Sequence, residues 1–252
     1  MELVDEHLRS YIDEPEFIAL LQWLTYGGPD ICAAWIGKYQ PATRSTDEKL
    51  ADLARFSREH YFLYLYFVRN WMECRGRVLD IGSGTCQRTS MLSRYSTHVD
   101  GVELDPVQAR FGGKYNGGGS ISLYVGSYPE QFSILDPIPT FDYIFASEII
   151  EHVPLEEQER FIGFSLSILN PGGRMFITCP NDGLGGKPVT RGSPHVGLWG
   201  EKEHSDMVAS LGPRVLFSGY ASVSGLNMAG SATLDSLIVG QEPADHYVLV
   251  LE

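Results

Sequence analysis

Short apolar runs alternate with longer, helix-like stretches from about residue 77 onward. Val78, Leu79 and Ile81 fall on both faces of an extended chain, so this first run suits a strand that is buried on both sides. Similar runs predict further strands at Val99–Asp105, Ser120–Gly126, Phe141–Ala146 and Arg174–Cys179. Because helix-like stretches separate these runs, the pattern indicates an α/β fold with a mostly parallel sheet.

The turn that follows the first strand carries the first chemical signal. Gly82 and Gly84 let the backbone turn sharply and approach a ligand, as in nucleotide-binding βαβ units. Asp80, at the end of the strand, would repel a pyrophosphate, but a carboxylate can bind a cationic amino group or accept hydrogen bonds from hydroxyls. We therefore expect S-adenosylmethionine rather than NAD. Glu103 ends the second strand about twenty residues later, where folds of this type place the acid that binds ribose.

With these motifs in this order, the chain resembles the class I S-adenosylmethionine-dependent methyltransferases over roughly residues 77–252. The Phe141-Asp142 strand and the Leu169–Gly173 turn complete the family's order of motifs. The resemblance implies a Rossmann-like, seven-stranded, mostly parallel sheet with helices on both faces. It also implies a cofactor site formed by Asp80, Gly82, Ser83, Gly84, Glu103, Leu104 and Ser127.

The sequence departs from the family pattern in the cofactor motifs. Cys86 stands where a third glycine is usual, and Gly126-Ser127 replaces a Gly-Asp pair whose acid meets the adenine amine. The ribose contact is thus better supported than the adenine contact. The fold needs two more strands for its antiparallel final pair, but three apolar runs are available, and the sequence does not say which is extra: Arg214–Tyr220, Asp235–Val239 and His246–Leu251.

The segment Ser147–Pro154 follows the fourth predicted strand and combines two carboxylates with an imidazole. Glu148, Glu151 and His152 offer oxygen and nitrogen ligands for a divalent cation if the turn is tight. This pattern resembles that of the ubiquinone-pathway O-methyltransferases and of the small-RNA 3′-end 2′-O-methyltransferases. The resemblance implies a metal held by Glu148, Glu151, His152 and one later histidine, which we expect to be His195, with His204 as a substitute.

Methyl transfer to oxygen requires an aligned hydroxyl and a base that takes its proton. A bound Mg²⁺ would favour a catechol or vicinal diol, with His152 or Glu151 collecting the proton. Without a metal, His152 alone can act as the base, and the acceptor can be a single hydroxyl or a nitrogen. The sequence thus predicts an O-methyltransferase acting on a small metabolite or sugar. The alternatives are an RNA 3′-end 2′-O-methyltransferase and a non-catalytic cofactor-binding subunit.

The composition limits the kinds of partner and environment that we expect for this protein. The formal net charge of −13 disfavours binding to nucleic acid, which depends on Lys and Arg contacts to phosphates. The four cysteines are far apart and include no Cys-x-x-Cys pair, so neither a zinc site nor a disulfide framework is indicated. No stretch reaches the ~20 apolar residues of a membrane span, and the acidic segment 1–11 is unlike a signal peptide, so we expect a cytoplasmic protein. The sequence does not indicate an oligomeric state.

Residues 1–75 are expected to form a helical extension before a core of residues 76–252. Ser45 and Glu48 have the spacing of a capping box, and no Gly or Pro interrupts the segment that they open, up to about Glu73. Its length favours a helix, although the aromatic run Tyr61–Phe67 would also suit a strand. These rings either pack on the sheet or form a lid in which Tyr61 or Tyr64 contacts cofactor or substrate.

Overall fold

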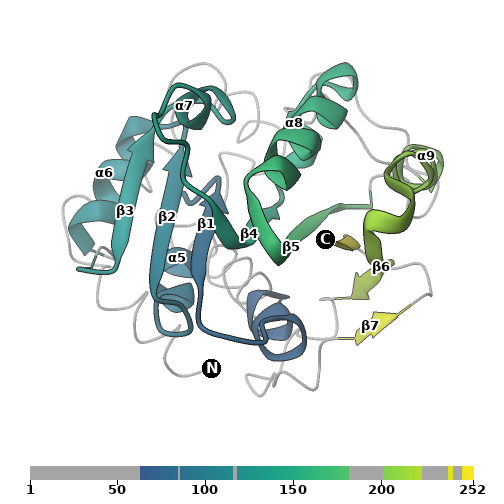
Figure 1. The fold of residues 1–252 in the computed structure, drawn as a ribbon, viewed down its shortest axis with the longest axis horizontal. Coiled ribbons are helices and arrows are strands. Elements are labelled where there is room, and N and C mark those ends of the chain that lie inside the picture. Colours follow the sequence, from purple (N-terminus) through teal and green to yellow (C-terminus); the bar gives the residue numbers. More distant parts are fainter. Residues whose placement is uncertain (1–62, 85, 116–117, 182–200, 223–237, 241–245) are drawn as a thin grey trace, which may run out of the picture.

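The computed structural model describes residues 63–84, 86–115, 118–181, 201–222, 238–240 and 246–252. These residues form an eight-stranded sheet in the order β3-β2-β1-β4-β5-β8-β6-β7 (Figure 1). The strands are β1 (Arg77–Ile81), β2 (His98–Glu103), β3 (Ile121–Val125), β4 (Phe141–Ser147), β5 (Leu169–Pro180), β6 (Val215–Ser222), β7 (Ile238–Gly240) and β8 (His246–Leu251).

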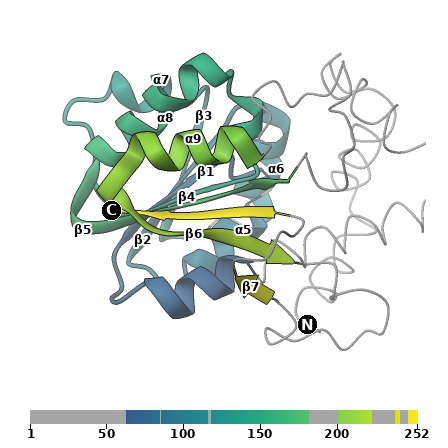
Figure 2. The same cartoon turned by 90° about the vertical axis from the view of Figure 1, so that its right-hand side faces the viewer.

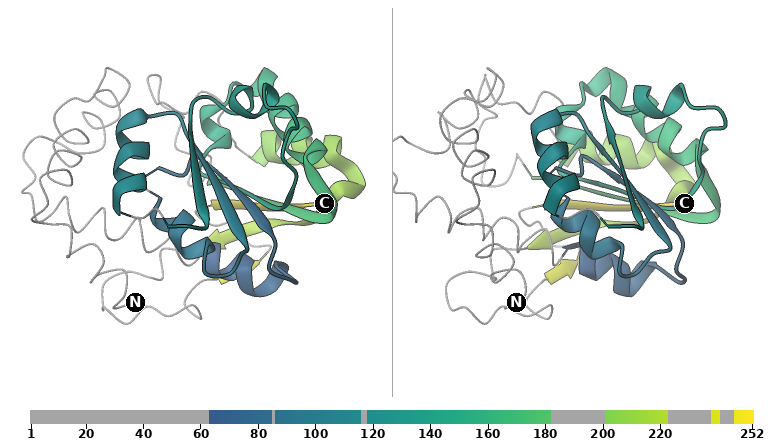
Figure 3. Two further views of the ribbon diagram at one scale, coloured as in Figure 1. Left: turned by 60° about the vertical axis from the view of Figure 1, so that its left-hand side comes forward. Right: turned by 90° about the vertical axis from the view of Figure 1, so that its left-hand side faces the viewer.

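The first five strands are parallel, and β8 lies antiparallel between β5 and β6. The prediction of a Rossmann-like, mostly parallel sheet is therefore confirmed. All three C-terminal apolar runs contribute strands, and the extra one is the short edge strand β7, which pairs with β6. The strands twist relative to one another along the sheet, as strands of L-amino acids do (Figure 3).

One strand boundary differs from the sequence prediction. The segment Leu169–Gly173, expected to be a turn before the strand, forms the first part of β5, and Leu169 pairs with Phe141 on β4. The register between the two strands then shifts before Arg174 pairs with Tyr143. Gly172 has φ of 78°, so the glycines bend the strand at this irregularity and do not end it.

Helices cover both faces of the sheet (Figure 2). The described helices are the segment 63–71, α5 (Gln87–Leu92), α6 (Pro106–Tyr115), α7 (Glu130–Ser133), η1 (Ile150–His152), α8 (Leu155–Ser167), α9 (Glu201–Leu211) and η3 (Gly212–Arg214). In Figure 2, α7, α8 and α9 lie on one side of the sheet, and α5 lies on the other. None of the helices in this part of the chain is long and apolar enough to cross a membrane.

The two faces are buried because successive side chains of each strand point to opposite sides. On β1, Leu79 and Ile81 join a core with Phe161 and Ile162 of α8. Val78 directly precedes Leu79, so it points to the opposite side and joins the other core together with Leu92 of α5. This two-sided burial explains why β1 is apolar at consecutive positions rather than at alternate ones.

The aromatic segment near residue 64 packs on the sheet as a helix. Tyr64 stacks on Phe145 with ring centroids 4.9 Å apart, and Phe67 stacks on Phe176 at 4.7 Å. Tyr64 and Phe67 are almost completely buried. Of the two roles considered for these rings, packing on the sheet is the one observed for residues 63–67. Tyr61 and most of the predicted N-terminal extension lie outside the described residues.

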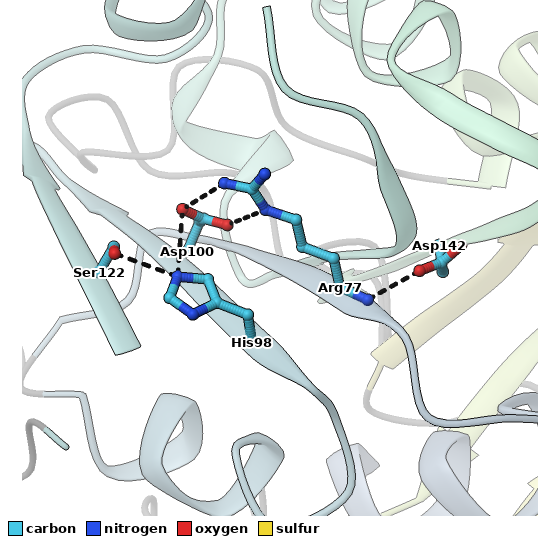
Figure 4. Close-up of polar contacts among 5 residues, drawn as sticks. All are labelled: Arg77, His98, Asp100, Ser122 and Asp142. Carbon is cyan, nitrogen blue, oxygen red and sulfur yellow. Dashed lines mark hydrogen bonds and ion pairs between the residues drawn. The ribbon is translucent and has the colours of Figure 1, made fainter. Parts of the chain in front are cut away.

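A polar network ties the beginning of β1 to its neighbouring strands (Figure 4). Arg77 donates two hydrogen bonds to Asp100 on β2, from Nε at 2.6 Å and from a terminal nitrogen at 3.1 Å. Its backbone nitrogen donates to Asp142 on β4 at 2.7 Å, and His98 contacts Ser122 on β3 at 3.0 Å. Asp100 is completely buried, and the bidentate guanidinium compensates its charge. The network fastens β1, β2, β3 and β4 together on the α7 side of the sheet.

Candidate active site

The glycine turn after β1 is held tightly against the turn that follows β4. Gly82 and Gly84 have φ of 70° and 55°, a conformation that glycine adopts at little cost. A Cβ atom on Gly82 would lie 2.0 Å from Cδ1 of Ile149. The side chain of Ile149 therefore occupies the space that any other residue at position 82 would need, and the two turns pack directly against each other.

Cys86 also adopts the left-handed conformation, with φ of 61° and ψ of 18°. This observation gives a physical reason for the glycine that the family usually has here. The Cys86 side chain is completely buried, and burial raises the pKa of its thiol to about 11. The thiol is therefore protonated at neutral pH and serves as packing, not as a nucleophile.

Asp80 lies at the carboxyl end of β1 and is completely buried. Its two carboxylate oxygens accept hydrogen bonds from the hydroxyls of Tyr64, at 2.9 Å, and Thr89, at 2.6 Å. Burial raises the pKa of Asp80, while the Thr89 hydrogen bond, the charge of Arg88 and the Tyr64 hydrogen bond oppose that rise. In this structure Asp80 thus connects the helical segment 63–71 to α5.

Glu103 ends β2 and faces the same turn. Its carboxylate accepts hydrogen bonds from the backbone nitrogens of Gly84, at 2.7 Å, and Asp105, at 2.8 Å. Burial raises the pKa of Glu103, and these two backbone hydrogen bonds act against the increase. Beside it, the side chain of Leu104 is 69% exposed. Ser127, after β3, is exposed and donates a hydrogen bond to Glu130 at 2.8 Å.

Glu148 follows β4 and is the second described non-glycine residue with positive φ, at 58°. Strain of this kind persists only where the surroundings hold it, and it is frequent at functional sites. The carboxylate of Glu148 accepts a hydrogen bond from Thr178 of β5 at 3.0 Å, and its other oxygen lies 3.5 Å from Nε2 of His246 on β8. The side chains of Glu148 and His246 are each only 12% exposed.

Glu151 and His152 lie together on η1 but differ in accessibility. Glu151 is 1% exposed, whereas the His152 side chain is 43% exposed, and Nε2 of His152 lies 3.9 Å from Oε1 of Glu151. Gln158 of α8 fixes this turn by donating hydrogen bonds to the backbone oxygens of Ile150, at 2.9 Å, and Val153, at 3.1 Å. His152 lines a surface pocket of about 220 Å³. The other residues that line this pocket are Ser127, Tyr128, Pro129, Glu130, Val153, Pro154, Glu157, Arg160 and Phe161.

Comparison with known proteins identifies the type of site. A family model described as a methyltransferase domain matches residues 51–211. The chain belongs to this family. Together with the fold, the match identifies a class I S-adenosylmethionine-dependent methyltransferase domain, as the sequence motifs predicted.

Individual relatives agree with this assignment. The methyltransferase is 30% identical over 141 residues to a ubiquinone biosynthesis O-methyltransferase of Paramagnetospirillum magneticum, a match that covers 54% of this chain and 53% of the relative. The chain thus spans about half the length of this curated relative.

Two solved structures share the fold at low identity. The N-methyltransferase NodS of Bradyrhizobium japonicum WM9, in complex with S-adenosyl-L-homocysteine, has a TM-score of 0.54 at 13% identity, over 94% of this chain and 98% of its own. The magnesium protoporphyrin IX methyltransferase ChlM of Synechocystis PCC 6803, with bound SAH, has a TM-score of 0.56 at 13% identity, over 93% and 98%.

The predicted metal ligands of the methyltransferase are only partly described. His195 lies outside the described residues. Within the part of the chain that the structure describes, no three His, Cys, Asp or Glu side chains are grouped as a metal site would require. Glu148, Glu151 and His152 therefore do not form a ligand cluster among themselves. His204, the substitute, is buried on α9 and stacks on Tyr247 with ring centroids 4.3 Å apart, so it does not complete one.

The structure adds residues to this site that sequence reasoning missed. Thr89 binds the carboxylate of Asp80, and Thr178 and His246 contact Glu148. Tyr64, considered above only for packing or a lid, also binds Asp80. Thr89 lies in the helix that follows the glycine turn, so an inward-facing polar residue there was a usable signal. His246 had none, because only the antiparallel insertion of β8 beside β5 brings its first residue to the end of β4.

Proposed function

We propose that the enzyme transfers a methyl group from S-adenosylmethionine to a hydroxyl of a small metabolite or sugar. The observation that carries the proposal is the half-exposed imidazole of His152, on the turn packed against the glycine loop and on the wall of a pocket. The name of the curated relative, an O-methyltransferase, supports oxygen as the acceptor atom. The formal net charge of −13 favours a small acceptor over RNA.

The described residues fit the cofactor. Glu103 presents a carboxylate of the kind that binds ribose hydroxyls, and Leu104 offers an exposed apolar side chain beside it for the adenine ring. Gly82, Ser83 and Gly84 form the turn that would face the methionine part, and Ser127 would lie beside the adenine. The bound cofactor supplies an electrophilic methyl group.

The chain's own residues then manage the acceptor proton. His152 takes the proton of the acceptor hydroxyl, because an imidazole has a pKa suited to this exchange near neutral pH. Glu151, with an oxygen 3.9 Å from the imidazole Nε2, stabilises the resulting positive charge. Within the described residues, the carboxylates and imidazoles do not group around a cation position, so this mechanism relies on the side chains of His152 and Glu151.

Metal assistance is a separate, finer hypothesis. It requires His195 to join Glu148, Glu151 and His152, and it narrows the acceptors to catechols and vicinal diols. Titration of Mn²⁺ into protein saturated with S-adenosylhomocysteine tests it directly. Binding at one site that a Glu148→Ala, His195→Ala variant loses would support metal assistance, and an absence of binding would refute it and leave His152 as the base for single hydroxyls.

Two variants test the proposed function itself. Glu103→Gln should weaken the binding of S-adenosylhomocysteine about tenfold or more, since a hydrogen bond to a charged group contributes about 1.5–3 kcal/mol. His152→Gln should leave that binding intact and lower turnover of a hydroxylated acceptor about 100-fold or more, the usual contribution of a general base. Calorimetry measures the first effect, and transfer of a labelled methyl group to a panel of catechols and sugars measures the second.

His98→Gln provides the control. His98 is a partly buried imidazole at the beginning of β2, away from the carboxyl ends of the strands, so both properties should stay unchanged. Normal turnover in the His152 variant would eliminate His152 as the base. A wild-type protein that does not bind S-adenosylhomocysteine would overturn the proposed function.

A further inference from the structure

Arg88 is a cation at the cofactor edge that the predicted site does not include. It lies in the first turn of α5, directly after the loop that contains Gly82, Gly84 and Cys86. The side chain is partly buried, and its guanidinium carbon lies 5.5 Å from the ring centroid of Tyr64. A guanidinium at this distance from an aromatic face is held by a cation–π interaction.

The ring beneath Arg88 is itself fixed in place. Tyr64 is 1% exposed, its ring stacks on Phe145 at 4.9 Å, and its hydroxyl donates to Asp80 at 2.9 Å. The second oxygen of Asp80 is bound by Thr89, which is the next residue after Arg88. Arg88 therefore rests on a rigid platform, which limits the positions that its guanidinium can take.

The donors of this guanidinium remain available within the described structure. No ion pair or hydrogen bond joins Arg88 to another of the described residues, whereas Arg77 and Arg174 each donate to an acid. Arg carries five N–H donors in a planar fork that matches a carboxylate. A preorganised guanidinium with unused donors beside a cofactor loop is suited to bind an anionic group of the ligand.

The charges around the loop determine which group that is. The carboxylates of Asp80, Glu103 and Glu148 lie at or just after the carboxyl ends of β1, β2 and β4, so this edge favours the ammonium of an amino acid over its carboxylate. A ligand that carries both groups needs a cation on one side. We propose that Arg88 binds the carboxylate of the cofactor's amino-acid part. This inference rests on the proposed function, since it assumes that S-adenosylmethionine is the cofactor.

A pair of ligands separates this role from a structural one. S-adenosylhomocysteine carries the amino-acid carboxylate, and its decarboxylated analogue retains the ammonium and the adenosine but lacks the carboxylate. The affinities of both are measured by calorimetry for the wild-type protein, Arg88→Met, Arg88→Lys and the control Arg94→Met. Arg94 is an exposed arginine that lies just beyond the end of α5.

For Arg88→Met we expect an affinity for S-adenosylhomocysteine about 10- to 100-fold lower, the effect of losing a bidentate, charge-assisted pair. The affinity for the decarboxylated analogue should remain as in the wild type, so that the preference for the carboxylate disappears. Arg88→Lys should retain part of the preference for the ligand with the carboxylate, because lysine keeps the positive charge but lacks the planar fork of donors. Arg94→Met should match the wild type for both ligands.

Equal losses for both ligands in Arg88→Met, or no loss for either, would overturn the inference and leave the proposed function standing. A melting temperature of Arg88→Lys equal to that of the wild type shows that the fold is intact when the two affinities are compared. If the wild-type protein bound neither ligand, the proposed function would fail, and the inference would fail with it.

Discussion

The left-handed backbone at Cys86 leads to a prediction in which the usual order of two substitutions is reversed. At most positions glycine is less stabilising than alanine by roughly 0.5–1 kcal/mol, because it loses more conformational entropy on folding. A residue with a Cβ pays roughly 1–2 kcal/mol for the left-handed conformation, and Cys86 has φ of 61° and ψ of 18°. Subtracting the first term from the second, we expect Cys86→Gly to be more stable than Cys86→Ala by up to about 1.5 kcal/mol.

Both variants remove the buried thiol, so its packing contribution cancels in the comparison. Urea unfolding followed by circular dichroism gives the two free energies of unfolding, since a change in midpoint at constant slope reports stability. Ser90, in the middle of the same helix, provides the matched reference: there Ser90→Ala should be more stable than Ser90→Gly by about 1 kcal/mol. If alanine were the better residue at both positions, the explanation of the missing family glycine by backbone strain would be wrong.

Further predictions concern buried polar groups. Tyr64→Phe removes one of the two hydroxyls that bind Asp80 and should lower the free energy of unfolding by about 1–3 kcal/mol, whereas the partly buried Tyr66→Phe should change it little in the same urea experiment. An equal effect of both variants would contradict the role of the Asp80 hydrogen bond. Burial lowers the pKa of His204 to about 4, so the folded protein holds this imidazole neutral while the unfolded chain takes up a proton below about 6.5. Stability contributed by the neutral form should therefore be complete above pH 6.5 and fall toward pH 4, by at most about 1.4 kcal/mol per pH unit and less where solvent screens the charge. His204→Phe should make the free energy of unfolding depend less steeply on pH between pH 4.5 and 7. An unchanged dependence on pH would refute this assignment.

Sequence predicted most reliably those features that depend on local pattern. The strands β1 to β4 appear within a residue or two of their apolar runs, because a strand buried on both faces leaves a continuous apolar signature. The beginning of β5 was mispredicted because Pro171 and the following glycines are typical of turns, and only pairing with β4 extends the strand through them. The structural context, not the local propensity, determined the conformation there.

In the candidate site, too, local sequence pattern predicted some features, and others depend on contacts between distant segments. Glu103 could be predicted because its role follows from its distance along the chain from the glycine turn. The fully buried state of Asp80 could not, since its partner Tyr64 comes from a segment whose helical packing only the fold defines. Likewise, His246 reaches Glu148 across strands that are far apart in sequence, and no local pattern records that contact.

The contact between Gly82 and Ile149 has a consequence for the order of events during turnover. The isoleucine side chain fills the space above the glycine, so the loop that would face the cofactor and the turn that carries His152 cannot shift independently. Any movement of the loop when the cofactor binds is therefore expected to reach the wall of the acceptor pocket at His152, three residues further along. An enzyme built in this way is expected to bind its methyl donor first and to capture its acceptor only afterwards.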